Sequence, residues 1–267
     1  MDWPSIVLAG ISGGLAAGIA VLLVGTSKER RLPFIVVLVV AMIGINHYSG
    51  RFVLPRIHDW QAERGILEIP LYREVAANDP EMYREIKSAT LKGMKKGERK
   101  EIIASQISTI IATSLPRYIV RASDESVIAF AELMVKQTDY LSHVNPDACY
   151  QFLFPHEFGE PGLASRYLDK AYERQSIDVM TRIFHSAVKM PQDLPDAKRS
   201  EVLLDQVTKS LNKDFGADLL LIQKKPTDAE GRKKVCILTT ALYNHALGLP
   251  QRDSSMLLRY IFLPSGN

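Results

Sequence analysis

The chain has 267 residues and a mass of 29.9 kDa, with 46% hydrophobic and 24% charged residues. This composition is that of a folded protein, and it excludes a disordered chain or a collagen-like repeat. The net charge of +3 is too small to indicate nucleic acid as a partner, and we expect none. Two cysteines exclude a disulfide-dense scaffold and a Cys-rich zinc module.

Two long uncharged segments open the chain, over residues 3–27 and 32–50, separated by the four residues KERR. A helix of about 20 apolar residues crosses a bilayer with all its backbone hydrogen bonds satisfied internally. We therefore predict a hairpin of two transmembrane helices, over about 4–26 and 32–50. A cleaved signal peptide and a buried soluble hairpin are the alternatives. The start Met-Asp-Trp-Pro is not basic and the first segment is long, which argues against the signal peptide.

Small residues line one face of the first predicted span. Gly10, Gly14 and Gly18 follow one another at intervals of four, so they share a helix face. Such a face lets two helix backbones approach closely in lipid. Its partner is either the second span or a second copy of the chain, so the sequence leaves open whether the protein forms a homo-oligomer.

The loop between the two spans sets the expected topology. It contains Lys28, Arg30 and Arg31, and basic residues in short loops favour the cytoplasmic side. Three arginines, at positions 51, 56 and 64, follow the second span and weaken the bias. We predict that the loop is cytoplasmic in a bacterial inner membrane and that residues 51–267 lie in the periplasm. Cys149 and Cys236 fit either compartment, as buried thiols inside or as one disulfide outside.

Residues 51–267 are expected to form one all-α soluble domain of about eight helices. Cap residues, prolines and apolar residues at helical spacing mark these helices. One begins at Asp79, and the others cover 102–116, 123–144, 148–154, 163–190, 196–215, 235–246 and 256–262. The segment 163–190 is expected to be the longest, and 217–223 is the one candidate strand.

The sequence contains no motif that predicts catalysis, a cofactor or a metal ion, and we expect none of the three. Residues 156–160 (HEFGE) begin like a zinc-protease motif, but the second histidine is missing. Cys149 has histidines at 143 and 156, so a thiol nucleophile with a base is conceivable, although its apolar surroundings favour a core position. Asp169 and Glu173 are interpreted as charges on a helix surface.

The strongest concentration of charge covers residues 84–100, with seven basic residues and two acidic ones. It is consistent with contact to anionic lipid headgroups or to an acidic partner. Gly93 and Gly97 instead suggest a helix end with a turn, whose lysines interact with the helix dipole and with solvent.

These patterns favour a membrane-anchored accessory or scaffold protein without enzymatic activity, whose helical domain binds a protein partner. The setting would be an envelope complex for secretion or transport, or the capture of a toxin by an immunity protein. Two other classes stay open: a membrane-tethered enzyme whose site assembles from distant residues, and a pore-forming defence effector with a cytoplasmic sensor domain.

The predicted topology is tested by fusing alkaline phosphatase, which is active only after export, to the C-terminus. We expect an active fusion, because the basic loop favours the cytoplasm. Replacing Lys28, Arg30 and Arg31 by neutral residues should lower this activity. An inactive fusion, beside a fluorescent cytoplasmic reporter at the same site, would reverse the assignment.

Overall fold

The computed structural model describes residues 54–155, 163–223 and 226–263, with the side chains of 54–58 and 223 left out. No helix within these ranges is both long and apolar enough to cross a bilayer. The predicted spans lie outside the described residues. So do the residues singled out in them, which are Gly10, Gly14, Gly18, Lys28, Arg30 and Arg31.

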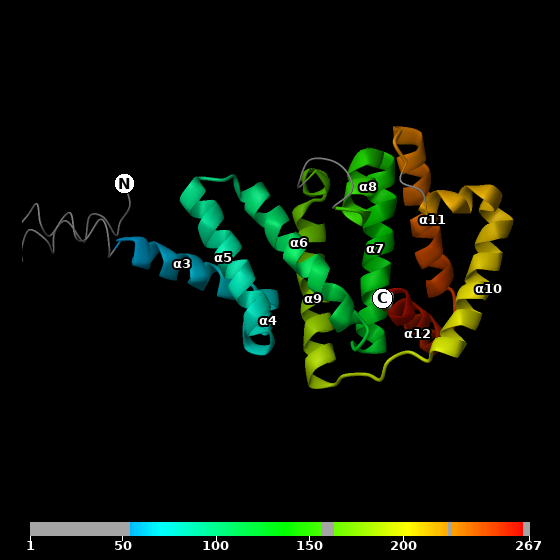
Figure 1. The fold of residues 1–267 in the computed structure, drawn as a ribbon, viewed down its shortest axis with the longest axis horizontal. Helices are drawn as coiled ribbons and strands as arrows, with labels where there is room; N and C mark the ends of the chain where they lie inside the picture. Colours follow the sequence, from blue (N-terminus) through cyan, green and yellow to red (C-terminus); the bar gives the residue numbers. More distant parts are fainter. Residues whose placement is uncertain (1–53, 156–162, 224–225, 264–267) are drawn as a thin grey trace, which may run out of the picture. The chain divides into compact units, whose positions relative to one another are not determined.

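Within the described ranges the chain forms ten α-helices and two 3-10 helices and contains no strand, which confirms the all-α class (Figure 1). The α-helices are α3 (Leu54–Glu68), α4 (Pro70–Asn78), α5 (Pro80–Lys96), α6 (Lys100–Ile119), α7 (Asp124–Val144), α8 (Pro146–Leu153), α9 (Lys170–Lys189), α10 (Ala197–Phe215), α11 (Ala229–Leu247) and α12 (Gln251–Ile261). The 3-10 helices are η3 (Ala164–Arg166) and η4 (Gly216–Gln223).

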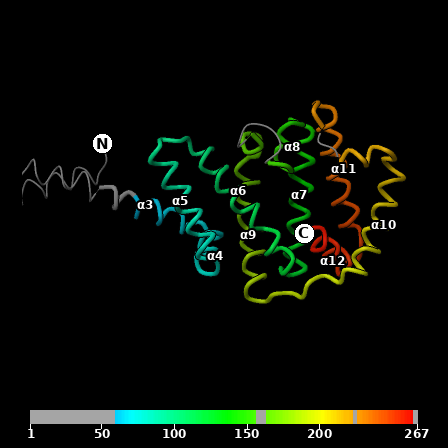
Figure 2. Tube along the Cα trace, viewed as in Figure 1, coloured from blue at the N-terminus to red at the C-terminus, as the bar shows by residue number. Residues whose placement is uncertain are grey.

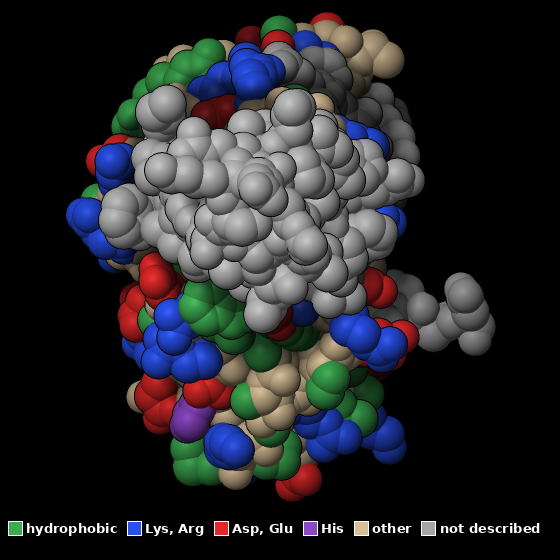
Figure 3. All heavy atoms as spheres, turned by 90° about the vertical axis from the view of Figure 1, so that its left-hand side faces the viewer, with side chains coloured by type: hydrophobic (Ala, Val, Ile, Leu, Met, Phe, Trp, Pro, Cys, Tyr) green, Lys and Arg blue, Asp and Glu red, His purple; other side chains and the backbone are tan. Residues whose placement is uncertain are grey.

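The chain divides into two units between Gly65 and Ile66, and the second unit holds nearly all the described helices. In this unit α7 packs against α8, α9, α11 and α12, so most of its faces are covered (Figures 1 and 2). The helices α4 and α6 pack against α9, and α5 pairs with α6 as a hairpin. On the face shown in Figure 3, acidic, basic and hydrophobic side chains are interspersed.

Three clusters of buried apolar side chains hold the second unit together. The largest joins α6, α7, α9, α10, α11 and α12, and a second joins α4, α5, α6 and α9. The third lies between α7, α8 and α11 and includes Cys149 and Cys236. Apolar burial is the main stabilising term in such a fold.

Side-chain caps begin the helices where the sequence predicts them. Asp79, Ser123, Asn145 and Asp196 each accept a hydrogen bond from a backbone N–H in the first turn of the next helix. Such caps satisfy donors that have no partner inside the helix. Gly216 follows α10 with φ of 52°, as expected for the residue that ends this helix.

Several sequence expectations about element ends are wrong. The helix expected to end near Pro116 continues to Ile119, because Leu115 and Ile119 are buried and hold the last turn in the core. The longest described helix is α7, since Asp169 caps α9 and the helix starts only at Lys170.

Residues 217–223 form the 3-10 helix η4 rather than a strand, and no strand lies in the described ranges to pair with them. The last helix begins at Gln251, directly after Pro250, so Asp253 lies in its first turn. The described part of the domain has more α-helices than the eight expected. The sequence pattern did not predict α3 and α4.

A small polar cluster fixes the junction of α4 and α5 against α6. The carboxylate of Asp79 accepts a hydrogen bond from the Tyr118 hydroxyl at 2.6 Å and forms an ion pair with Arg117. Burial alone would raise the pKa of Asp79, but the hydrogen bonds from Tyr118 and from the Met82 N–H, with the charge of Arg117, lower it below 3.8. Burial and the bond to Asp79 raise the pKa of Tyr118 to about 12.

The depressed pKa of Asp79 predicts a pH-dependent contribution to stability. A carboxyl group with a lowered pKa in the folded state stabilises it above the unfolded pKa, and this stabilisation disappears as pH falls below about 3.8. Asp79→Asn keeps the helix cap but loses the charge, so we expect about 1–2 kcal/mol lower unfolding free energy at pH 7. The difference from wild type should shrink as pH falls through this range, measured by urea unfolding followed by circular dichroism. The exposed control Asp193→Asn should show a much smaller difference.

Candidate protein-binding groove

A groove of about 610 Å³ runs between α7 and α11 and ends at the start of α8. Two helices that pack side by side, as these do, leave a furrow along their line of contact. Its lining residues are Asp139, Ser142, His143, Pro146, Lys233, Ile237, Thr240, Ala241 and Asn244. We call this surface the α7–α11 groove.

Helical spacing explains why these residues share the groove. The three residues from α7 occur at positions i, i+3 and i+4, and the five from α11 at i, i+4, i+7, i+8 and i+11. Both patterns place side chains on one face of a helix. On α11 the opposite face carries Val235 and Leu238, which are buried in the core.

The groove combines an apolar centre with a charge of each sign. Ile237 is 41% exposed although it is a large hydrophobic residue, and Ala241 and Pro146 lie in the same lining. The α7 wall carries the exposed Asp139, and the α11 wall carries the exposed Lys233. An apolar strip flanked by charged side chains is the chemistry of surfaces that bind an amphipathic helix.

Covalent and hydrogen-bonded links hold the two walls together. Cys149 of α8 and Cys236 of α11 form a disulfide, both are fully buried, and 87 residues separate them in sequence. The hydroxyls of Thr138 and Thr240 form a hydrogen bond of 2.8 Å directly between α7 and α11. These links fix the position of α11 relative to α7 and α8, so the groove is preformed.

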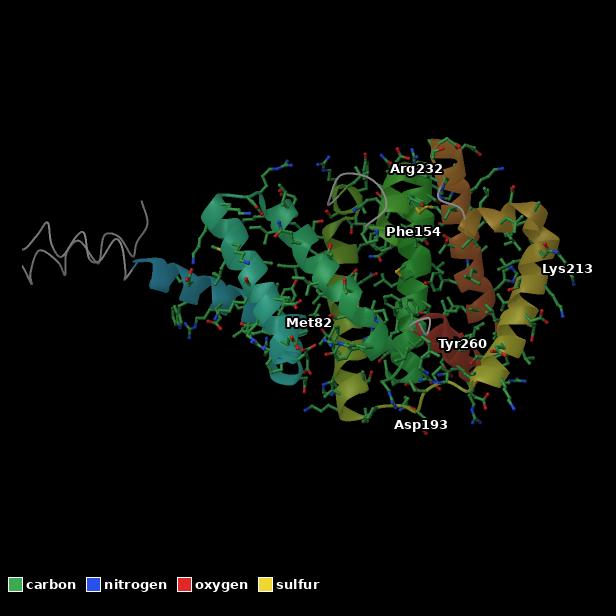
Figure 4. The ribbon with its side chains drawn as sticks, viewed as in Figure 1. Met82, Phe154, Asp193, Lys213, Arg232 and Tyr260 are labelled. Carbon is green, nitrogen blue, oxygen red and sulfur yellow. A yellow bond between two sulfur atoms is a disulfide. The ribbon has the colours of Figure 1, made fainter. Side chains whose placement is uncertain are left out.

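An ion pair between α11 and α8 adds a further link, with its arginine buried and its aspartate partly exposed. Arg232, in the first turn of α11, donates to Asp147 of α8 at 2.7 Å and to the Thr227 carbonyl at 2.9 Å. Figure 4 shows Arg232 at the end of α11 that lies beside α8. The Arg232 side chain is 8% exposed and that of Asp147 is 38% exposed, so the pair joins a buried charge to one near the surface.

Ser142, His143 and Asp139 lie together in the groove but do not have the geometry of a catalytic triad. The Ser142 hydroxyl donates to the Asp139 carbonyl at 2.8 Å, so its proton is already used. The His143 Nδ1 lies 2.7 Å from the same carbonyl and 3.4 Å from the Ser142 hydroxyl. A triad requires the nucleophile and the carboxylate on different ring nitrogens, whereas here both lie at Nδ1.

The other residues that the sequence suggested for catalysis or metal binding have structural roles or lie outside the described residues. Cys149 is bonded to Cys236, so no thiolate is available as a nucleophile. Asp169 caps α9 by accepting from the Ala171 and Tyr172 N–H groups, which is a structural role. Residues 156–160 lie outside the described residues. In the described ranges, no three or more His, Cys, Asp or Glu side chains are grouped to hold a metal ion.

Sequence reasoning missed the groove residues. The one available signal was Ile237, an apolar residue on the face of α11 opposite to that marked by Val235, Leu238 and Leu242. A single apolar residue on a polar face is common, however, so this signal alone does not identify a site.

Comparisons with known proteins give no independent indication of function. No protein-family model matches the chain, and no curated protein and no solved structure is significantly similar to it.

The disulfide predicts a large response to reduction. A bridge over about 90 residues restricts the unfolded chain and typically adds about 2–5 kcal/mol to the unfolding free energy. We expect reduction with dithiothreitol to lower the urea midpoint of the wild-type protein. Replacing both Cys149 and Cys236 by Ala should produce a similar loss, after which dithiothreitol should have no further effect. A wild-type protein with two free thiols under non-reducing conditions would contradict the pairing.

Proposed function

We propose that the protein is a membrane-anchored accessory or scaffold protein whose helical domain binds a protein partner through the α7–α11 groove. The observation that carries this proposal is a preformed groove with an exposed isoleucine between charges of opposite sign. The occupant that fits best is an amphipathic helix of the partner. It would place an apolar side chain on Ile237, a basic residue near Asp139 and an acidic residue near Lys233.

The disulfide supports the periplasmic location that the proposal includes. Disulfides form and persist in oxidising compartments such as the bacterial periplasm, and they are rare in the cytosol. The Cys149–Cys236 pair therefore agrees with the direction of the predicted topology, in which the basic loop is cytoplasmic and the helical domain is exported. Both arguments favour an accessory protein that binds a partner in the envelope over a pore-forming effector with a cytoplasmic sensor domain.

The groove is tested by site-specific photo-crosslinking of the full-length protein in cells. A photo-reactive phenylalanine analogue is placed at Ile237, or at the control position Val202 on α10, which is 59% exposed. We expect a discrete adduct from position 237 and none from position 202. Because the proposed partner helix is basic near Asp139, the substitution Asp139→Lys should reduce the adduct about tenfold or more.

Three outcomes of this experiment would contradict the proposal. They are the absence of any adduct at position 237, the same adduct from both positions, and an adduct that Asp139→Lys leaves unchanged. Mass spectrometry of the cross-linked peptide should locate the contact in a helical segment of another protein. An adduct to a second copy of the chain would identify the groove as a homo-oligomer interface instead.

A further inference from the structure

One face of α5 borders an open hollow of about 600 Å³ beside α6. Helix α5 packs against α4 and α6, and its residues Met82 and Ile86 are buried in that packing. The residues of α5 that line the hollow follow one another at positions i, i+4, i+7, i+8, i+11 and i+15, so they share one side of the helix. We call this surface the α5 face, and it consists of Glu81, Glu85, Ser88, Ala89, Lys92 and Lys96.

The charges on the α5 face are sorted along the helix. Glu81 and Glu85 lie in its first half and Lys92 and Lys96 in its second half, and all four are exposed. Each like pair is four residues apart, a spacing at which like charges repel within a helix. The helix dipole favours Glu81 in the first turn and Lys96 in the last. Because this effect is confined to the terminal turns, it does not account for Glu85 and Lys92.

Small side chains separate the acidic half of the α5 face from the basic half. Ser88 and Ala89 are half-buried there, and small residues at a contact let two helices approach closely. Across the hollow, Ile110 of α6 adds a half-buried apolar side chain. A helix laid along this face would therefore meet small and apolar groups at the centre and charges toward both ends, which is the usual layout of a protein interface.

The order of charges on the α5 face is complementary to its own reverse. A two-fold axis through the middle of the face would set the α5 helix of a second copy antiparallel to the first. Glu81 of one copy then lies opposite Lys96 of the other. By the same symmetry Glu85 lies opposite Lys92, and each of these pairs forms twice. A parallel arrangement would instead bring every charge against its own counterpart.

The two remaining charged residues of the hollow do not oppose this arrangement. Arg84 would lie opposite Gly93 of the second copy, which carries no charge. Glu98 accepts a hydrogen bond from Gln106 at 3.0 Å and lies 3.7 Å from the Lys96 ammonium of its own chain. Ion pairs at such distances on a surface are weak, and the Lys96 side chain is 71% exposed, so it stays accessible to a second copy.

We propose that two copies of the chain pair through their α5 faces, as antiparallel helices related by a two-fold axis. Opposite charges across an interface favour the matching partner, and like charges exclude other arrangements. A helix of another protein would need these charges in the reversed order, whereas a second copy supplies them by symmetry. The pairing involves neither the predicted spans nor the α7–α11 groove, so a dimer of this kind would carry two such grooves.

Cysteine cross-linking of the purified full-length protein tests the antiparallel geometry. Ser88→Cys lies beside the proposed axis, so mild oxidation should link it to its counterpart as a disulfide dimer. Arg84→Cys should give at least tenfold less dimer, because the two copies of this residue would lie about 13 Å apart along the helices, and a disulfide needs Cα atoms within about 7 Å. Val202→Cys, exposed on α10, measures random collision. The native cysteines are bonded to each other and do not compete.

Charge reversal in the Ser88→Cys protein tests the recognition. Glu85→Lys sets lysine against lysine on both sides of the axis, so the yield of dimer should fall about tenfold. Lys92→Glu should lower it as much, because it sets glutamate against glutamate. When the two variants are mixed with tags of different mass, the mixed dimer should form as fully as the wild-type dimer, since every pair is again opposite in charge. The controls Glu201→Lys and Lys213→Glu, at exposed positions of α10, should have little effect.

Four outcomes would overturn the proposal. A yield at position 88 no higher than at position 202 would show that the α5 faces do not meet, even if the copies associate through another surface. Equal yields at positions 84 and 88 would exclude the antiparallel arrangement. A yield at position 88 that Glu85→Lys leaves unchanged would exclude recognition by charge. Mixed variants that fail to link would show that the single reversals act on the fold of each copy and not on a symmetric pair.

Discussion

The packing of helix α7 is the constraint on which the rest of the domain depends. Four other helices contact it, so some of its polar side chains, including Gln137 and Thr138, are buried and must find hydrogen-bond partners within the protein. Gln137 donates to Ser176 of α9, and Thr138 pairs with Thr240 of α11. Each of these bonds is formed only when the neighbouring helix sits in one register. The buried hydrogen bonds along α7 therefore specify the positions of α9 and α11 relative to it. The apolar clusters supply most of the stability.

The groove follows from this arrangement. Once α11 is fixed against α7 by the threonine pair and against α8 by the disulfide, the face with Val235 and Leu238 is buried and the opposite face lines the surface. Ile237 belongs to the second face, and its exposure is therefore a consequence of a rigid arrangement rather than of loose packing. A rigid surface binds with little loss of conformational entropy, which favours recognition of a partner.

The α7–α11 groove offers apolar contact with one charge of each sign, which suits a single specific partner helix.

The sequence by itself determined the all-α class and the starts of several helices, because caps and apolar spacing are local properties of the chain. Ser123 and Asn145 cap their helices as predicted, since a cap needs only the residues of the next turn. Tertiary contacts decided where a helix ends when burial in the core opposed the local signal. Pro116 favours a helix end, but the burial of Ile119 carries α6 past it.

The candidate site depended on tertiary structure almost entirely. Cys149 and Cys236 are 87 residues apart, and no spacing rule states whether they meet. Asp139, Lys233 and Ile237 are ordinary residues in the sequence and become a groove only when α7 and α11 lie side by side. The run of positive charge over residues 84–100 was visible in the sequence, but the close approach of Gly93 on α5 to Ile103 on α6 was not, because it is a contact between two helices. Local patterns thus determine elements, whereas sites arise from contacts between residues that are distant in the chain.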